Sequence, residues 1–452
     1  MKKLLLNLPR NWSMNNKFYF ALLVTLFHFG FSCAQPTISI EEVVQMALQK
    51  NYDIQVARTT AATQFTDKRF IYGAFIPTIN FSGQYNKNFN NIINQSFGSA
   101  EKHYDGLSFS TGPTPSIQAA WTLFDGTKMF ATKKRLNQLA EWGETNIRNQ
   151  MMNTVAATMT NFYSIVRQQE QLKAIQEVMA VNLERVKLAE RKLEVGTGAK
   201  PELLQAKVDL NAQRTLAVQQ EILIQQIKDQ MNGQLGFGLP TSYEIADTIP
   251  INMNLNLEEI TSNIEGSNQT VLAAKKNLDI ATTAVWETKA GRYPVIQALS
   301  SYNFSRNENK IQYGAVQKLT QTLFFSYGVG ISIPIINNMN VSRLIAQARV
   351  TQSRMQAIYD QQKTLATVGV LNAFTNYENS KRILQIQEEN ILVAKENVAI
   401  ALAGFRRGIT TFIELRTAQQ SLSDAYNQLI AARFSTKSSE IELMRLQGAL
   451  LK

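Results

Sequence analysis

Two long stretches of the chain lack proline and carry apolar residues at helical spacing. They span residues 127–195 and 339–407. A continuous helix of about 68 residues is roughly 100 Å long at ~1.5 Å per residue, which exceeds the size of a single compact domain. The glycines that follow, Gly196 and Gly408, are the expected turns into a second helix, because glycine adopts turn conformations readily.

The two returning helices repeat apolar residues with heptad spacing, which is typical of helices packed in coiled coils. The small alanines among them allow neighbouring helices to approach closely. These positions are Leu203, Leu210, Ala217, Ile224 and Met231 in the first returning helix, and Leu415, Ala418, Leu422, Ala425, Leu429 and Ala432 in the second.

Four shorter segments alternate apolar and polar residues, the period of β-strands with one apolar face. They lie near residues 77–89, 116–124, 294–305 and 325–335, and the third alternates less cleanly than the others. A polar loop joins the strands of each pair. Their aromatic residues could form belts at a membrane interface or could be ordinary packing residues: Phe81, Tyr85, Trp121, Tyr302, Phe324 and Tyr327.

The order of these elements occurs twice along the chain, and such repeats change the interpretation of the whole fold. A shift of 217 residues aligns the early part of each copy and pairs Pro77 with Pro294. After a loop difference the shift becomes 212 residues for the long helices and their turns. We predict two helix–strand–strand–helix–helix units, over residues 35–245 and 246–452.

The first 34 residues have the pattern of a secretory signal peptide, with a basic start, an apolar run over residues 18–32 and small residues after it. The apolar run is shorter than the roughly 20 residues that a membrane-spanning helix needs. Cys33 leaves two interpretations open, because it could lie in a cleavage site before Gln35 or become a lipid-modified first residue. We favour simple cleavage and expect the mature protein to leave the cytoplasm.

The composition limits the chemistry of the mature chain. Cys33 is the only cysteine, and only one of the two histidines, His103, lies beyond the leader. Disulfides, thiolate catalysis and His or Cys metal clusters are therefore all but excluded. No paired acid or catalytic triad stands out, so we expect neither enzymatic activity nor a metal or cofactor.

The charge gives no indication of a nucleic-acid partner. The formal net charge is +11, but four of the positive charges lie in the leader, which leaves about +7 spread along the mature chain. No basic stripe of the kind that follows nucleic acid is present. The hydrophobic content of 44 % places the chain among foldable proteins rather than disordered ones.

Strands with one apolar face allow two locations for the sheet. The sheet could pack on a helical domain in water, or its apolar face could contact lipid. In a bilayer every backbone polar group must be paired, so only a closed barrel is possible, and four strands cannot close around a pore. On the second interpretation several identical chains share one barrel, with Ile331 and Ile333 facing lipid and Ser332 facing the lumen.

Several segments resemble the TolC family of outer membrane efflux and secretion channels. The runs 194–206 and 406–418 are similar to that family's repeated helix-hairpin turn. The opening Ser39–Leu48 resembles its first helix, and Trp121–Gly126 resembles its strand-to-helix junction. Together these segments cover nearly the whole mature chain in the family's order.

The resemblance implies a mainly helical chain with membrane strands that assembles as a homotrimer in the bacterial outer membrane. Each chain would contribute four strands to a twelve-stranded barrel and long helices to a periplasmic tunnel. The tunnel mouth would meet a periplasmic adaptor protein that couples it to an inner-membrane pump, and conduction would be passive. The rival interpretation is a periplasmic coiled-coil adaptor or filament protein outside the membrane, against which the four alternating strands argue.

The resemblance also implies where the narrow periplasmic opening lies. In the family, acidic residues at the hairpin turns line this opening, and the matching residues are Glu202 and Glu414. A ring of carboxylates would favour cations. The alternative role is helix capping, because Thr411 and Glu414 form a capping-box pattern and Glu202 follows Pro201 at a helix start. Both roles remain open at this point.

Three positions near Glu414 depart from the best-known member of the family. A tyrosine, a basic residue and a second acidic residue are replaced by Phe405, Thr410 and Thr417. We keep these three residues as candidates for the lining of the opening, and we do not carry over the polar latch of that family member to this chain.

Overall fold

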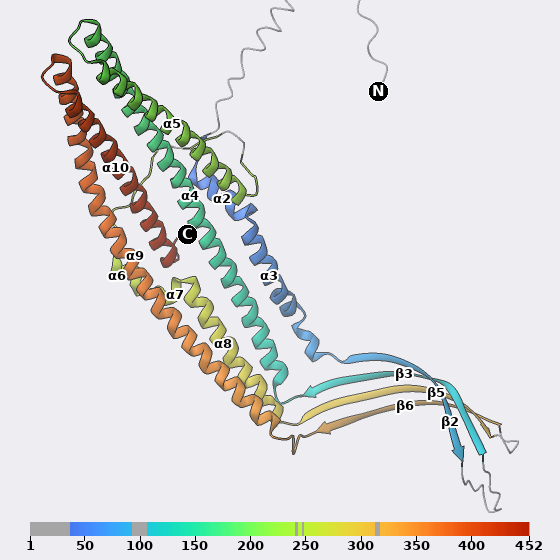
Figure 1. Ribbon diagram of the computed structural model, residues 1–452. Coiled ribbons are helices and arrows are strands. Elements are labelled where there is room, and N and C mark those ends of the chain that lie inside the picture. Colours follow the sequence, from blue (N-terminus) through green and yellow to red (C-terminus); the bar gives the residue numbers. More distant parts are fainter. Residues whose placement is uncertain (1–36, 93–105, 240–242, 246–247, 312–316, 452) are drawn as a thin grey trace, which may run out of the picture.

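The protein is an elongated helical body with a four-stranded sheet at one end (Figure 1). The computed structural model describes residues 37–92, 106–239, 243–245, 248–311 and 317–451. The expected leader, Cys33 and His103 lie outside these ranges.

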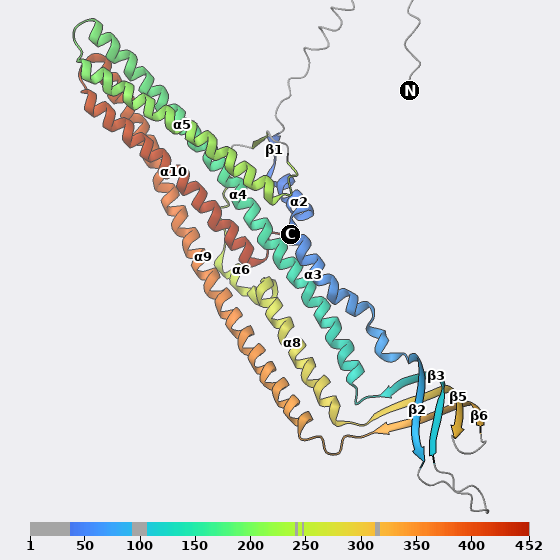
Figure 2. The same ribbon diagram turned by 45° about the vertical axis from the view of Figure 1, so that its right-hand side comes forward.

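Two helices run the whole length of the helical body. They are α4 (Lys128–Glu194) and α9 (Asn340–Arg407), with 67 and 68 residues as the sequence predicts. Each reverses at a glycine into a return helix, α5 (Lys200–Gln234) or α10 (Phe412–Gln447). Both hairpin turns lie at the end opposite the sheet (Figure 1, Figure 2). No helix in the described part of the chain combines the length and apolarity that a membrane crossing requires.

Shorter helices extend the layer toward the sheet. The helix α3 (Tyr52–Arg69) packs along α4, and α8 (Gln269–Lys289) contacts both α4 and α9. The order of neighbours is therefore α5–α4–α10–α9 near the turns and α3–α4–α8–α9 near the sheet (Figure 2). The remaining elements are α2 (Ile40–Lys50), α6 (Leu257–Ser262), α7 (Ile264–Ser267), the 3₁₀ helices η1 (Ile71–Phe75) and η2 (Ala290–Arg292), and the parallel pair β1 (Thr37–Ile38) and β4 (Glu244–Ile245).

Two asparagines join the start of a short helix to the end of a return helix. The side chain of Asn51 accepts two backbone N–H groups at the start of α3, and its Nδ2 donates to the carbonyl of Gln234 at 3.0 Å. Asn268 makes the same contacts at the start of α8 and donates to the carbonyl of Leu446 at 3.0 Å. Each asparagine thus satisfies otherwise unpaired groups at two helix ends.

The heptad positions of the return helices form much of the helical core. All six predicted positions of α10 are buried, and they pack in one cluster with Leu384, Ile391 and Val398 of α9. In α5, Leu210, Ile224 and Met231 are buried, while Leu203 and Ala217 are partly buried. Full burial of an aliphatic side chain contributes about 1.5–3 kcal/mol relative to exposure, so this stripe holds each hairpin together.

The sheet has the order β2–β3–β5–β6, and every neighbouring pair is antiparallel. Its strands are β2 (Thr78–Ile92), β3 (Gly106–Phe124), β5 (Val295–Ile311) and β6 (Gln317–Ser332). All four predicted strands are therefore present, and the mainly helical fold with a small antiparallel sheet is confirmed.

Several of the predicted strand bounds need correction. The first strand ends at Ile92 instead of residue 89, the third ends at Ile311 instead of residue 305, and the fourth starts at Gln317 instead of residue 325. The second strand starts at Gly106 instead of residue 116, because backbone pairing continues where side chains no longer alternate. The fourth strand ends at Ser332, so Ile333 and Ile335 lie beyond it. Pro334 follows at once, and proline cannot donate a ladder hydrogen bond.

Candidate functional site

The strand register gives the sheet one apolar face. Ile79, Ala119, Ser300 and Tyr327 lie opposite one another in one row of this face. Its large apolar side chains are exposed in the single chain, and Tyr327 is 84 % exposed. An apolar surface of this extent marks a contact with lipid or protein. Its large exposed members include Ile79, Phe81, Tyr85, Ile117, Trp121, Tyr302, Leu323, Phe325, Tyr327, Val329 and Ile331.

The apolar face has the height of a membrane band. Near the helices, the indole Nε1 of Trp121 donates to the carbonyl of Phe75 at 2.9 Å. Near the loops the apolar rows end where Gln321 lies opposite Arg306. The ten steps along the strand from Gln321 to Ile331 span roughly 33 Å at about 3.3 Å per residue. At a strand tilt of about 40° this corresponds to about 25 Å, the height of the apolar band of membrane barrels.

The opposite face of the sheet is polar and uncharged over its central rows. Ser82 and Ser116 share a hydrogen bond of 2.7 Å, and Ser301 and Ser326 share one of 2.8 Å. Among the described residues, the rows from Thr78 to Gln84 carry no charged side chain on this face. Such a surface suits contact with water.

Five of the six predicted interface aromatics lie on the apolar face: Phe81, Tyr85, Trp121, Tyr302 and Tyr327. The position of Phe324 differs from the prediction. Phe324 shares a row with Asn303 and Ser116 on the polar face, and its neighbour Phe325 takes the apolar position. The reason is the period of two, which lets only one of two adjacent aromatics point to a given face.

The sheet is open at both edges. Within the described residues, β2 pairs only with β3, and β6 pairs only with β5. These edge strands are 15 and 16 residues long. A long edge strand presents a row of unpaired backbone groups and is a template for pairing with another chain.

The helical layer is open in the same way. Its outer helices near the turns are α5 and α9, and each exposes apolar residues at coiled-coil spacing. On α9 these are Ile386, Val393 and Ile400, at 61 %, 66 % and 64 % exposure. On α5 they are Leu204, Val208, Val218 and Ile222. Both edges of the layer therefore lack the packing that coiled-coil helices require.

The two hairpin turns have the same backbone geometry. Gly196 and Gly408 both have φ of +78°. The N–H of Thr197 donates to the carbonyl of Lys192, and that of Ile409 donates to the carbonyl of Gly404, each at 2.9 Å. This is the Schellman arrangement, in which a left-handed residue ends a helix, and glycine adopts that conformation without a steric penalty.

The two glutamates at the turns have different surroundings. Glu414 and Thr411 form a capping box, in which the Thr411 N–H donates to Glu414 Oε2 at 2.8 Å and the Glu414 N–H donates to Thr411 Oγ1 at 3.2 Å. Hydrogen bonds from Thr411 to the carboxylate, first from its backbone N–H and then from its side chain, lower the pKa of the exposed Glu414 carboxyl. Glu202 lies in the first turn of α5, whose cap residue Ala199 offers no side-chain hydrogen bond.

The other three candidates for the opening lie at different depths. Phe405 is 2 % exposed and packs against Phe412, with the Lys192 ammonium 3.7 Å from its ring centroid. Its side chain therefore belongs to the core of the hairpins and does not reach a solvent-filled opening. Thr417 is exposed and donates to the carbonyl of Ile413, and Thr410 packs on Gly404.

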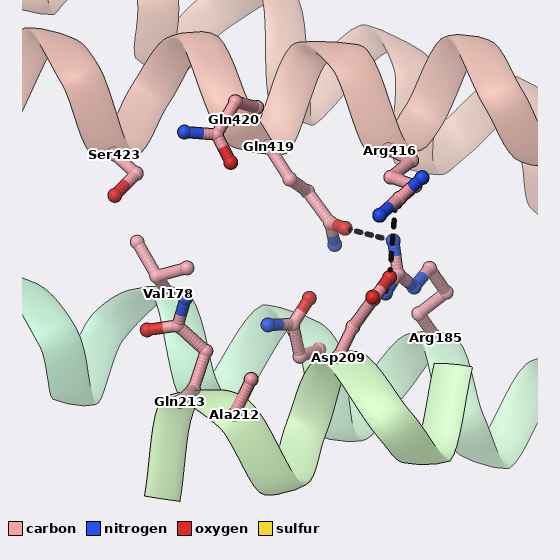
Figure 3. A pocket seen from close by; sticks show the side chains of 10 residues that line it. Val178, Arg185, Asp209, Ala212, Gln213, Arg416, Gln419, Gln420 and Ser423 are labelled. Atoms are coloured by element: carbon pink, nitrogen blue, oxygen red, sulfur yellow. Dashed lines mark hydrogen bonds and ion pairs between the residues drawn. The ribbon is translucent and has the colours of Figure 1, made fainter. Parts of the chain in front are cut away.

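Sequence reasoning did not find a polar cluster between the two hairpins (Figure 3). Arg185 of α4 is 1 % exposed and contacts Asp209 of α5 at 2.5 Å and Gln419 of α10 at 2.7 Å. Arg416 of α10 also reaches Asp209, at 3.2 Å. Burial lowers the pKa of Arg185, and Asp209 opposes this effect. The available signal was a charged residue at a helix position whose neighbours on the same face are apolar, with Val178 two turns before it and Ala189 one turn after it.

The sequence model of the outer membrane efflux protein family matches residues 43–236 and 260–449. The chain belongs to this family. The chain is 22 % identical over 395 residues to outer membrane protein TolC of Vibrio cholerae, covering 83 % of each chain. It is also 19 % identical to the toluene efflux pump outer membrane protein TtgC of Pseudomonas putida, covering 91 % of this chain and 83 % of that one.

Solved structures show the same fold. The outer-membrane channel OprN superposes with a TM-score of 0.72 at 18 % identity, covering 91 % of this chain and 90 % of that one. The CmeC outer membrane channel of Campylobacter jejuni superposes with a TM-score of 0.70 at 14 % identity, covering 98 % and 94 %. These structures confirm the fold, and the family model with the curated relatives confirms the predicted family, outer membrane location and role as an exit duct. The family consists of channel proteins, not enzymes.

Proposed function

We propose that the chain is one protomer of a homotrimeric duct that receives substrates from an inner-membrane pump and a periplasmic adaptor and conducts them passively across the outer membrane. The observation that supports the assembly most strongly is that both layers of the protomer are open at two edges. Within the described part of one chain, neither the backbone groups of the edge strands nor the apolar stripes of the edge helices can find a partner.

The sheet requires other copies of the chain if its apolar face meets lipid. The edge groups of β2 and β6 would be unpaired in the hydrocarbon, where each such group costs several kcal/mol. Pairing β6 of one copy with β2 of the next is a head-to-tail contact, which closes into a ring when the rotation is right. Three copies would supply twelve strands, the number that the family resemblance implies.

The helical layer supports the same ring. The exposed stripe of α5 can pack against that of α9 in the next copy. In both layers the first half of the chain forms one edge, with β2 and α5, and the second half forms the other, with β6 and α9. A single rotation can therefore close the barrel and the helical tunnel together.

We also propose that the two halves, residues 35–245 and 246–452, are copies of one ancestral unit. The family model matches once in each half. Asn51 and Asn268 make equivalent contacts, and Gly196 and Gly408 form equivalent turns.

The walls and ends of the duct support passive conduction. The polar face of the sheet would line the lumen, and its uncharged serine, asparagine and glutamine side chains would discriminate little by charge. At the hairpin ends, Val195, Ile409 and Ile413 are between 73 % and 77 % exposed. These apolar side chains are where we expect the adaptor to dock.

Membrane fractionation followed by native mass spectrometry tests this proposal. The mature protein should fractionate with the outer membrane, and detergent extracts should contain an assembly of three chains that dissociates on boiling. A monomer in the soluble periplasmic fraction would contradict the proposal. An outer membrane assembly with another number of copies would contradict the trimer alone.

A further inference from the structure

The polar cluster between the hairpins surrounds a pocket of about 160 Å³. This volume corresponds to roughly five water molecules at about 30 Å³ each. Its wall contains eight polar side chains from three helices (Figure 3), among them Asn182 and Arg185 of α4, Asp209 of α5, and Arg416, Gln419 and Gln420 of α10.

Two buried donor groups at the pocket lack an acceptor within the described part of the chain. Arg185 carries only donors, so Gln419 must turn its Oε1 toward it, as the 2.7 Å contact shows. This orientation points Gln419 Nε2 away from Arg185, and among the described residues neither this group nor Arg185 Nε has an acceptor. Both side chains are at least 96 % buried, at 1 % and 4 % exposure. A buried donor without an acceptor is unfavourable.

The pocket also has an excess of positive charge. Two guanidinium groups, those of Arg185 and Arg416, face a single carboxylate, that of Asp209. Both oxygens of this carboxylate are already engaged, Oδ2 by the two arginines and Oδ1 by Gln205 at 2.9 Å. The carboxylate therefore has little capacity left for the free donors of Gln419.

We propose that this pocket binds one small monovalent anion, a halide or a carboxylate group, between the two hairpins. Such a ligand carries acceptors only, balances the remaining positive charge and fits the volume. It would contact α4 of the first hairpin and α10 of the second, so binding would stabilise their packing. The proposal concerns the protomer alone and does not depend on the trimer.

Thermal unfolding of the purified full-length protein in detergent tests the site. Bromide or acetate replaces gluconate at constant ionic strength, and the melting temperature is followed. We expect a saturable rise with at least one of the two small anions, because a ligand that binds only the folded state stabilises it. A rise with bromide alone assigns a halide site, and a rise with acetate alone assigns a carboxylate site.

Two variants separate the site from general salt effects. Gln419→Glu supplies its own carboxylate to Arg185 and should lose the anion-dependent rise. Arg433→Gln removes an α10 arginine that pairs with Glu170 and Glu388 outside the pocket, and it should keep the rise. An unresponsive wild-type protein, or an equal rise in Gln419→Glu, would overturn the proposal.

Crystallography gives a second readout that needs no variant. Crystals of the wild-type protein soaked in bromide should show an anomalous peak within hydrogen-bond distance of Gln419 Nε2. The absence of this peak at saturating bromide, together with no response to acetate in solution, would exclude the anion site even if Gln419→Glu does not fold.

Discussion

The two turn glutamates show that equivalent sequence positions can have different environments. Glu414 is held in a capping box with Thr411, whereas Glu202 lies in a helix start without a capping side chain. The pattern Thr411–Glu414 predicts the box, because its residue types and spacing are local. The burial of Phe405 was not predictable in the same way, since it depends on Phe412 and Lys192 from other helices.

Replacing both Glu202 and Glu414 by glutamine tests their role at the opening. In the proposed trimer six carboxylates lie near one axis and attract cations. We expect the double variant to show weaker cation selectivity and weaker block by multivalent cations in planar bilayers, with assembly intact. Glu221→Gln, on the same helix about 28 Å from Glu202 at ~1.5 Å per residue, is the control. Unchanged selectivity in an inserted double variant would leave helix capping as their role.

The stability contributed by ionised Glu414 should depend on pH. Its pKa is lowered in the folded state, so its ionised form stabilises the fold above the unfolded-state pKa, and this contribution is lost as pH falls through the folded-state value. Glutamine also fits a capping box. The melting temperature of wild type should therefore exceed that of Glu414→Gln at pH 7, and the difference should shrink below about pH 4. A difference that is constant with pH would contradict this account.

At the scale of elements, helix lengths and strand existence follow from local patterns, but strand ends do not. The absence of proline and the heptads predict α4, α9 and their return helices. The strand ends depend on partners, because β3 continues to Gly106 along β2. The sequence also could not predict which helices pack against one another, because similar heptads occur on several helices.

Adjacent substitutions in β6 test the assignment of its two faces. Phe325 lies near the middle of the apolar rows, and Ser326 points to the opposite face. Arginine at a lipid-facing position near the midplane costs about 2–4 kcal/mol, so Phe325→Arg should lower the free energy of unfolding in lipid vesicles by that amount. Ser326→Arg should have a much smaller effect. Equal losses would show that the register does not separate a lipid face from a lumen face.

At the scale of the whole molecule, the central feature is that both layers of the chain are open at two edges, which supports the proposed ring of several copies. The sheet and the helical layer both end in unpaired edges, and the same half of the chain forms the same edge in each layer. The alternating strands and the family resemblance predict a shared barrel. The particular edges, β2 with β6 and α5 with α9, follow only from the order of elements in space.

Disulfide trapping between β2 and β6 tests this account most directly. These strands are separated by two others, hence by about 14 Å at ~4.8 Å per strand, whereas a disulfide requires Cα atoms within about 7 Å. A bond between them must therefore join different copies. Each test variant carries Cys33→Ser, one cysteine in place of Asn80, Ser82 or Gln84, and a second cysteine in place of Ser326. At least one of these three pairs should give covalent dimers and trimers and nothing larger. Monomers alone for every pair, after oxidation in the outer membrane, would contradict a ring closed through these edges.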